Sequence, residues 1–244
     1  MLHHKFIGNH NSDYCIIFLH EGLGCIEMWK NYPKELCDLL NCQGLIYDRA
    51  GYGHSKGDLT TRDNTYLHQG ADELHQLIHD LNIESKNLIL YGHSDGGSIA
   101  LLFASRFPSL CKTLITEAAH VFVEQETLDG IKPAETAFKE GKLNGLEKYH
   151  GHNFNSVFYA WVNIWNHPTF LDWNIENELK NIQCNQLIIQ GLNDQYGTLK
   201  QVKSIETHTL GKTITFTPPD CGHAPFKEQK EQVLKEVQLF LKSL

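Results

Sequence analysis

The sequence contains no long hydrophobic run, and no stretch approaches the roughly 20 apolar residues that a membrane-spanning helix requires. Its opening residues, Met-Leu-His-His-Lys, lack the apolar segment of a secretory signal. There is no basic cluster, and 21 Lys and Arg residues against 29 Asp and Glu residues leave a formal net charge of −8. We therefore expect a protein that neither inserts into a membrane nor binds nucleic acid.

The cysteines do not form a disulfide pattern, because no two of the seven make a Cys-x-x-Cys pair and their number is odd. Cys15 and Cys184 lie in or beside predicted apolar strands, which is typical of reduced, buried thiols in a cytoplasmic protein. Cys25 and Cys221 lie near the motifs described below and could be reactive thiols. A packing role is the alternative for both.

The 15 histidines do not form a recognisable metal-binding pattern. His75 and His79 share one face of a predicted helix, with His68 earlier on it, and His150 and His152 flank a glycine. No acidic residue or cysteine completes a ligand set at a recognisable spacing. We therefore predict no metal site and expect these histidines to lie on the surface in contact with solvent.

What the sequence does contain is an alternation of short apolar runs and amphipathic stretches. Its 244 residues suffice for one domain with a substantial core. Predicted strands cover residues 6–9, 14–19, 44–47, 88–91, 113–116, 185–189 and 213–216. Predicted helices cover residues 26–40, 64–82, 98–104, 198–208 and 227–244. The alternation predicts an α/β fold, a mostly parallel sheet with helices on both faces, whose ligands gather beyond the carboxyl ends of the strands.

Residues 121–180 interrupt this alternation, because they contain no strand-like run and are rich in aromatic residues. We interpret them as a helical cap inserted into a core of residues 1–120 and 181–244, placed over the same edge of the sheet. Some of its aromatic residues are candidates to line an apolar substrate pocket. These candidates are Phe158, Trp161 and Trp165. The alternative is that they only hold the cap together.

The central motif is Gly92-His93-Ser94-Asp95-Gly96, which lies between a predicted buried strand and a predicted apolar helix. It fits the Gly-x-Ser-x-Gly nucleophile elbow, in which the serine occupies a strained turn from strand to helix. The residues two positions before and after the serine must be small, and glycine meets that demand on both sides of Ser94. An aspartate nucleophile at Asp95 would put His93 in a cramped position. An ordinary glycine turn is the alternative interpretation.

Two further residues follow predicted strands in the order that a Ser, Asp, His triad takes on such a sheet. A serine hydroxyl needs a base in contact with it, and a histidine base needs an orienting carboxylate. Asp194 and His223 each follow one of the last two predicted strands. We therefore predict Ser94, Asp194 and His223 as catalytic residues. Glu117, which ends an earlier strand, is the rival for the acid.

Acyl chemistry also requires hydrogen-bond donors for the oxyanion that develops in the transition state. The backbone N–H of Asp95, the residue after the nucleophile, is one candidate. The second donor of this oxyanion hole is expected from the glycine-rich loop at His20, with Gly22 as the first candidate and Leu23 as the next. Glu21 is unusual here because a carboxylate would oppose the negative charge unless it turns away or bonds locally. We expect Glu21 to turn away.

Together these motifs resemble the alpha/beta-hydrolase superfamily along nearly the whole chain. The matching motifs are the His-x-Gly loop at His20, the loop Asp48-Arg49-x-Gly51-x-Gly53-x-Ser55, the elbow, Asp194 and the Gly222-His223 pair. The resemblance is to small, capped hydrolases of the esterase, lactonase and carbon–carbon hydrolase kind. It implies an acyl-enzyme mechanism without a cofactor, in which Ser94 attacks, His223 carries protons and Asp194 orients the histidine. The sequence departs from the family pattern at Glu21, where glycine is usual, and in a short N-terminus that is expected to lack a first strand.

The leading functional hypothesis is a serine hydrolase that cleaves a carboxylic ester, thioester or lactone in a small-molecule acyl substrate. The aromatic cap favours an apolar acyl or alcohol part. One alternative is carbon–carbon bond hydrolysis or lyase chemistry on the same triad. Another is a ligand receptor on the same scaffold that does not turn its ligand over.

Overall fold

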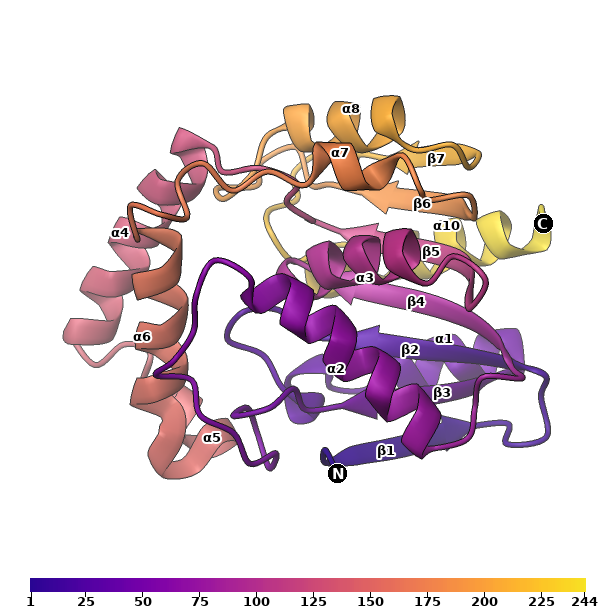
Figure 1. Ribbon diagram of the computed structural model, residues 1–244, viewed down its shortest axis with the longest axis horizontal. Helices are drawn as coiled ribbons and strands as arrows, with labels where there is room; N and C mark the ends of the chain where they lie inside the picture. Colours follow the sequence, from indigo (N-terminus) through magenta and orange to yellow (C-terminus); the bar gives the residue numbers. More distant parts are fainter.

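The computed structural model describes all residues 1–244 and contains one seven-stranded sheet in the order β1-β3-β2-β4-β5-β6-β7 (Figure 1). The strands are β1 (His4–Gly8), β2 (Tyr14–Leu19), β3 (Gln43–Tyr47), β4 (Asn87–His93), β5 (Cys111–Glu117), β6 (Asn185–Ile189) and β7 (Thr213–Phe216). All neighbouring strands are parallel except β1, which pairs antiparallel with β3 at one edge. This is the mostly parallel α/β sheet that the alternation predicts.

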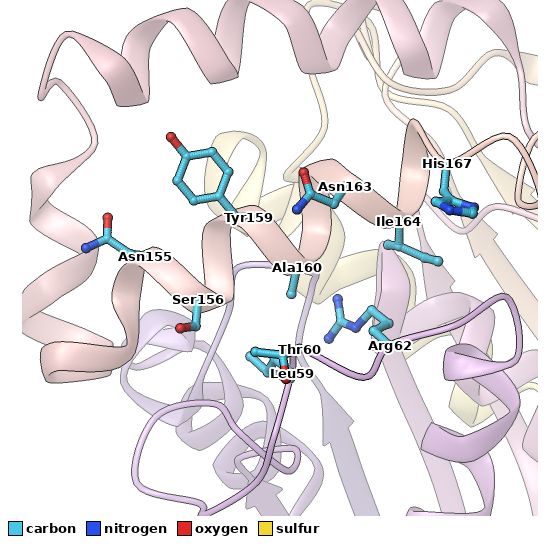
Figure 2. Close-up of a pocket in the computed structure, with 10 residues that line it drawn as sticks. All are labelled: Leu59, Thr60, Arg62, Asn155, Ser156, Tyr159, Ala160, Asn163, Ile164 and His167. Atoms are coloured by element: carbon cyan, nitrogen blue, oxygen red, sulfur yellow. The ribbon is translucent and has the colours of Figure 1, made fainter.

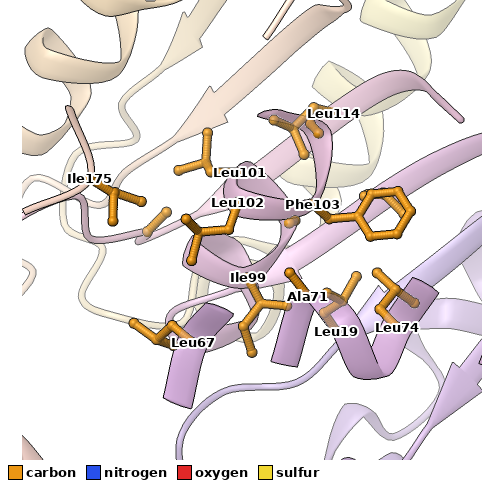
Figure 3. Close-up of a cluster of buried hydrophobic side chains, with 14 of the residues drawn as sticks. Leu19, Leu67, Ala71, Leu74, Ile99, Leu101, Leu102, Phe103, Leu114 and Ile175 are labelled. Atoms are coloured by element: carbon orange, nitrogen blue, oxygen red, sulfur yellow. The ribbon is translucent and has the colours of Figure 1, made fainter. Parts of the chain in front are cut away.

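The inner strands are covered on both faces, which explains their continuous apolar sequences. Every residue of β3 is buried, as is all of β2 after Tyr14. The helices α2 (Tyr66–Asp80) and α3 (Asp95–Arg106) cover one face and share the larger core cluster with the sheet (Figure 3). The helices α1 (Tyr32–Leu40) and α10 (Lys230–Lys242) belong to a second cluster on the other face.

The helix α3 is buried almost along its whole length, with only Arg106 exposed. It packs against the sheet and is flanked by α2 and α7 (Glu176–Leu179), so it carries mostly apolar or small side chains all round (Figure 1). The helix α2 is amphipathic instead, and it buries Leu67, Ala71, Leu74 and Ile78 at intervals of three to four residues. They belong to the larger cluster, in which Figure 3 shows Leu67, Ala71 and Leu74 beside Ile99 of α3. The helices α2 and α3 thus form one layer on this face of the sheet, and α3 starts directly after the turn that carries Ser94.

Residues 121–180 are mainly helical. They form α4 (Gln125–Lys139), α5 (Glu147–His150), α6 (Phe154–Trp165) and α7 (Glu176–Leu179), with short 3-10 turns at Asn144–Leu146 and Gly151–Asn153. In Figure 1, α4, α5 and α6 lie together beyond the carboxyl ends of the strands, whereas α7 lies beside α8 (Leu199–His208). Phe138 of α4 stacks on Phe158 of α6, with ring centroids 3.8 Å apart. This segment therefore stands at the edge of the sheet to which the predicted site residues lead.

Two of the predicted helices are divided in the structure. The predicted helix 26–40 is a 3-10 turn, Ile26–Trp29, followed by α1, because Lys30 has a φ of 55° that no right-handed helix continues through. The predicted closing helix 227–244 consists of α9 (Pro225–Glu228) and α10. These are separated at Gln229, whose ψ of 41° leaves the helical range.

None of the helices combines the length and the apolar character needed to cross a membrane.

Candidate active site

Ser94 lies in the turn between the end of β4 and the start of α3. Its backbone has a φ of 54° and a ψ of −119°, a conformation that is strained for any residue other than glycine. The turn is tight: a Cβ on Gly92 would lie 2.2 Å from the carbonyl oxygen of Gly96, and one on Gly96 would lie 2.0 Å from that of Leu19. The glycine spacing of the motif is therefore a packing requirement of this turn.

The side chains of Ser94, His223 and Asp194 form a continuous hydrogen-bonded line. Oγ of Ser94 is 2.9 Å from Nε2 of His223, and Nδ1 of His223 is 2.9 Å from each carboxylate oxygen of Asp194. The three residues are far apart in the chain, but they follow β4, β7 and β6 respectively. In this arrangement Nε2 can accept the serine proton while the carboxylate holds the Nδ1–H group.

Asp194 is a buried carboxylate that is held from several sides. It accepts hydrogen bonds of 2.8 Å from the Tyr196 N–H and of 2.7 Å from the Gln190 side chain. Burial alone would raise the pKa of Asp194, but the charge and hydrogen bond of His223 and the Tyr196 N–H lower it below its ordinary value. The group is therefore ionised and fixed in the orientation in which it meets His223.

The His223 ring is surrounded by negative charge. Burial would lower the pKa of His223, but the charge and hydrogen bond of Asp194, followed by the charges of Glu21 and Asp95, raise it above its ordinary value. An imidazolium at this position is therefore stabilised. This is the state that a histidine reaches when it takes a proton from a serine.

Glu117, the rival acid, has other partners. Its carboxylate accepts a hydrogen bond from the hydroxyl of Tyr91 and another, at 3.2 Å, from the backbone N–H of Phe226. Burial raises the pKa of Glu117 to about 7. The carboxylate that contacts the His223 ring is that of Asp194, and Glu117 belongs to a separate buried network.

Gly22 and Asp95, the first two candidates for the oxyanion hole, lie next to each other. A Cβ on Gly22 would be 3.3 Å from Oδ2 of Asp95. The Gly22 N–H donates to no group of the protein. The N–H of Asp95 has no acceptor within α3, because Asp95 is the first residue of that helix. Neither N–H is therefore occupied by an acceptor within the protein.

Glu21 does not turn away, and the expectation that it would is wrong. Its carboxylate accepts a hydrogen bond from the N–H of Leu23, two residues along the same loop. That bond occupies the Leu23 N–H, the next candidate donor after Gly22. Burial raises the pKa of Glu21, although the Leu23 N–H and the nearby Lys227 and His223 act in the opposite direction. A carboxylate therefore stays close to the candidate oxyanion hole.

His150 is a buried histidine that links the helical segment to two loops of the core, so the expectation of a solvent-exposed side chain is wrong for it. Its Nδ1 accepts a hydrogen bond of 3.0 Å from the Gly53 N–H, and its Nε2 is 2.9 Å from the carbonyl oxygen of Leu23. The ring therefore carries its proton on Nε2 and donates it to the loop of Gly22. The sequence around His150 shows only a histidine next to a glycine, which does not predict this burial or these contacts.

The three histidines of the predicted helix 64–82 contact protein groups or are exposed to solvent. His68 lies 2.9 Å from Glu178, His75 stacks on Phe107 with centroids 4.0 Å apart, and His79 is exposed. No group of three or more His, Cys, Asp or Glu side chains is placed to hold a metal ion.

The three predicted pocket residues occupy different positions. Trp161 contacts the glycine-rich loop at His20, because its ring lies 2.7 Å from where a Cβ of Gly22 would be. Trp165 packs against His120 with centroids 5.1 Å apart, and Phe158 stacks within the helical segment. Tyr196, which the sequence analysis did not single out, lies edge-on to both Trp161 and His223. Its place two residues after Asp194 was the available signal.

Cys25 and Cys221 are buried, and neither forms a disulfide. Burial raises the pKa of the Cys25 thiol to about 11 and that of the Cys221 thiol to about 12. Both are therefore protonated thiols at neutral pH, which favours the packing role over the reactive one.

Comparison with known proteins places these features in context. A family model described as the alpha/beta hydrolase fold matches residues 14–178. The chain is 30% identical to a proline iminopeptidase of Saccharolobus solfataricus, over 98% of this chain and 88% of that protein. It is 26% identical to the serine hydrolase BPHL of Homo sapiens, over 89% of this chain and 75% of that protein. Among solved structures, MenH from S. aureus covers 100% of this chain and 99% of its own with a TM-score of 0.77. At 17% identity that likeness concerns the fold alone.

Proposed function

Because the chain belongs to the alpha/beta hydrolase family and is a hydrolase of that type, we propose that it is a serine hydrolase acting through an acyl-enzyme intermediate. Its substrate is a carboxylic ester, thioester or lactone. The observation that carries this proposal is the 2.9 Å contact between Oγ of Ser94 and Nε2 of His223, continued at 2.9 Å from Nδ1 to Asp194.

The first half of the reaction transfers the acyl group to the enzyme. Oγ of Ser94 forms a bond to the carbonyl carbon while its proton moves to Nε2 of His223. The oxyanion of the tetrahedral intermediate accepts hydrogen bonds from the N–H groups of Gly22 and Asp95. When the intermediate collapses, the bond to the alcohol or thiol breaks and Nε2 gives its proton to that leaving group. A lactone opens in the same way, with its alcohol still attached to the acyl part.

The second half releases the acid. A water molecule gives a proton to Nε2 of His223 and attacks the carbonyl carbon of the acyl-serine. The bond to Oγ of Ser94 then breaks, and Oγ recovers the proton from Nε2. Residues 121–180 act as a cap on a core of residues 1–120 and 181–244, with Trp161 placed over the loop of Gly22. Ser94 is 8% exposed, so the reacting groups are largely shielded from bulk water.

Covalent labelling with a fluorophosphonate probe tests the proposal. The wild-type protein should gain one adduct on Ser94, located by peptide mass spectrometry, and Ser94→Ala should gain none. Ser105→Ala is the matched control, because that serine lies near the far end of the same helix and donates to the carbonyl of Glu178. Labelling that persists in Ser94→Ala, or a folded wild-type protein that does not react, would contradict the proposal.

A substrate panel then separates the reaction classes. Esters, thioesters and lactones of graded acyl length should be hydrolysed with a transient acyl-enzyme on Ser94, visible by intact mass spectrometry. A carbon–carbon hydrolase would be slow on simple esters. A non-turnover receptor would be acylated without releasing the acid.

A further inference from the structure

A cavity of about 390 Å³ lies between α6 and the loop that precedes α2 (Figure 2). Its lining mixes apolar side chains with polar ones. Thr60 and Arg62 come from the loop, and Asn155, Ser156 and Asn163 come from α6. Arg62 is the only lining residue with a permanent charge, and its guanidinium points toward α6 in Figure 2. The cavity thus presents one cation among neutral hydrogen-bonding groups.

Arg62 has no carboxylate partner. Arg49 lies 3.5 Å from Asp95 and Arg106 lies 2.7 Å from Asp72, but no acidic group is within ion-pair distance of Arg62. Its Nη2 donates to the hydroxyl of Tyr52 at 2.5 Å, and its Nη1 is buried without a hydrogen-bond partner. Nη1 of Arg62 therefore has no acceptor within the protein, and an oxygen of an anionic ligand would supply one.

Two acidic residues that border a neighbouring cavity together with Arg62 accept hydrogen bonds from other groups. A smaller neighbouring cavity is bordered by Arg62 together with Asp58 and Glu73. The Asp58 carboxylate accepts hydrogen bonds from Thr60, and the Glu73 carboxylate accepts one from the Ala50 N–H. Neither pairs with Arg62. The positive charge therefore remains available to a ligand that enters the larger cavity.

Two contacts link the walls of the cavity to residues next to Ser94 and to the loop of Gly22. The guanidinium of Arg62 lies over the ring of Tyr66, 4.6 Å from its centroid, and the hydroxyl of Tyr66 donates to Asp95 at 3.2 Å. Tyr66 therefore contacts both Arg62 and Asp95, the residue that follows Ser94. On the other wall, α6 presents Ala160 to the cavity and the next residue, Trp161, to the loop of Gly22.

We propose that the substrate of this hydrolase carries a carboxylate, separate from the bond that is cleaved, which Arg62 binds in the cavity beside α6. This inference rests on the proposed serine hydrolase function and specifies its substrate class. A guanidinium matches a carboxylate with two parallel N–H···O bonds. The side-chain amide of Asn163 and the hydroxyls of Ser156 and Thr60 supply further uncharged donors. The aromatic side chains near Ser94 then contact the apolar part between the two ends.

Pairs of p-nitrophenyl esters that differ only in a terminal carboxylate test this inference. The mono-p-nitrophenyl ester of adipic acid is compared with the hexanoate, and that of suberic acid with the octanoate. In the wild-type protein the anionic ester of at least one pair should have the higher kcat/KM, by about 10-fold, the value of a hydrogen bond to a charged group. In Arg62→Gln the ratio should fall to near one, mainly through KM, while Arg62→Lys should keep part of it.

Two further variants make the result specific. Arg106→Gln removes an exposed arginine from the far end of α3 and should leave the ratio unchanged. Asn163→Asp adds a carboxylate to the cavity wall opposite Arg62 and should lower the ratio without removing the arginine, which keeps the test valid if Arg62→Gln does not fold.

The outcomes separate the two proposals. Hydrolysis of both esters without a preference for the anionic one, or a preference that persists in Arg62→Gln and Asn163→Asp, overturns the carboxylate site and leaves the hydrolase proposal intact. If no ester is hydrolysed and the fluorophosphonate fails to label Ser94, both proposals fall.

Discussion

Nε2 of His93 lies 2.6 Å from the backbone carbonyl oxygen of His223. Burial lowers the pKa of His93 to about 3, so the ring is neutral and donates its Nε2–H to that carbonyl. The residue that precedes Ser94 therefore holds the backbone of the histidine that contacts Ser94. One hydrogen bond thus links the end of β4, next to the proposed nucleophile, to the loop before α9, which carries the proposed base.

Replacement of His93 should weaken catalysis without removing any reacting group. His93→Phe keeps a planar ring but leaves the His223 carbonyl buried without a donor, which costs about 1–3 kcal/mol. We expect kcat to fall by about 10-fold or more, with a smaller change in KM, and the urea midpoint to decrease. His93→Gln, which can still donate, should recover most of kcat. Equal loss of kcat in both variants would indicate that the ring shape matters and the hydrogen bond does not.

The line of Ser94, His223 and Asp194 could be predicted from the sequence because each residue directly follows a short apolar strand. Strands of that kind are readable from a few residues, and the rule that parallel strands end at one edge then brings their following residues together. Gly92 and Gly96 were predictable for a similar reason, since a sharp turn excludes side chains at both positions. These features depend on local sequence and on general topology.

The contacts that could not be predicted join residues that are distant in the chain and lie in loops. His150 meets the Leu23 carbonyl across 127 positions, and nothing in the sequence around either residue indicates the other. The orientation of the Glu21 side chain depends on its rotamer. One rotamer accepts the hydrogen bond from Leu23, and others would expose the carboxylate to water. That Arg62 forms no ion pair depends on where the acidic side chains lie in space, which only the three-dimensional structure shows.

The pH dependence of activity should respond to Glu21. In the proposed mechanism His223 must be neutral to accept the serine proton, so activity should be lost as the pH falls through its pKa, which Asp194, Glu21 and Asp95 raise. Glu21→Gln removes one of these negative charges, and the pKa of His223 should decrease. The acid limb of kcat/KM for a neutral ester should therefore move to lower pH than in the wild-type protein.

The control for this prediction is Glu231→Gln, which removes a carboxylate of the same type from an exposed position on α10. Its acid limb should coincide with that of the wild-type protein. An acid limb in Glu21→Gln at the wild-type pH, or at higher pH, would show that Glu21 carries no charge that His223 senses.

The stability of the fold should depend on pH through Glu117. Burial raises its pKa from 4.5 to about 7, so the folded state binds a proton more tightly than the unfolded state. The stabilisation is complete below pH 4.5 and is lost as the pH rises to 7, by about 3 kcal/mol in the free energy of unfolding. Urea unfolding of the wild-type protein at pH 5 and pH 8 should show this loss, and Glu117→Gln should remove most of it.

Other buried groups also titrate between pH 5 and pH 8. The change in the free energy of unfolding between these two pH values is therefore compared between the wild-type protein and Glu117→Gln. Glu84→Gln, which alters an exposed glutamate, should behave as the wild-type protein does. If Glu117→Gln kept the full pH dependence, Glu117 would be ionised in the folded state throughout this range.

The turn that carries Ser94 requires glycine at position 96, and Gly96→Ala tests this requirement. The added Cβ would lie 2.0 Å from the backbone oxygen of Leu19 in the neighbouring strand, where no flexible side chain can yield. We expect a loss of about 3 kcal/mol or more in the free energy of unfolding, together with loss of fluorophosphonate labelling at Ser94.

Gly145→Ala is the matched control, because nothing lies within 4 Å of the position of its Cβ. Urea unfolding of Gly145→Ala should fall within about 0.5 kcal/mol of the wild-type value or slightly above it. A Gly96→Ala protein that unfolds and labels as the wild type does would mean that β2 and the turn of Ser94 are not packed against each other as closely as these contacts require.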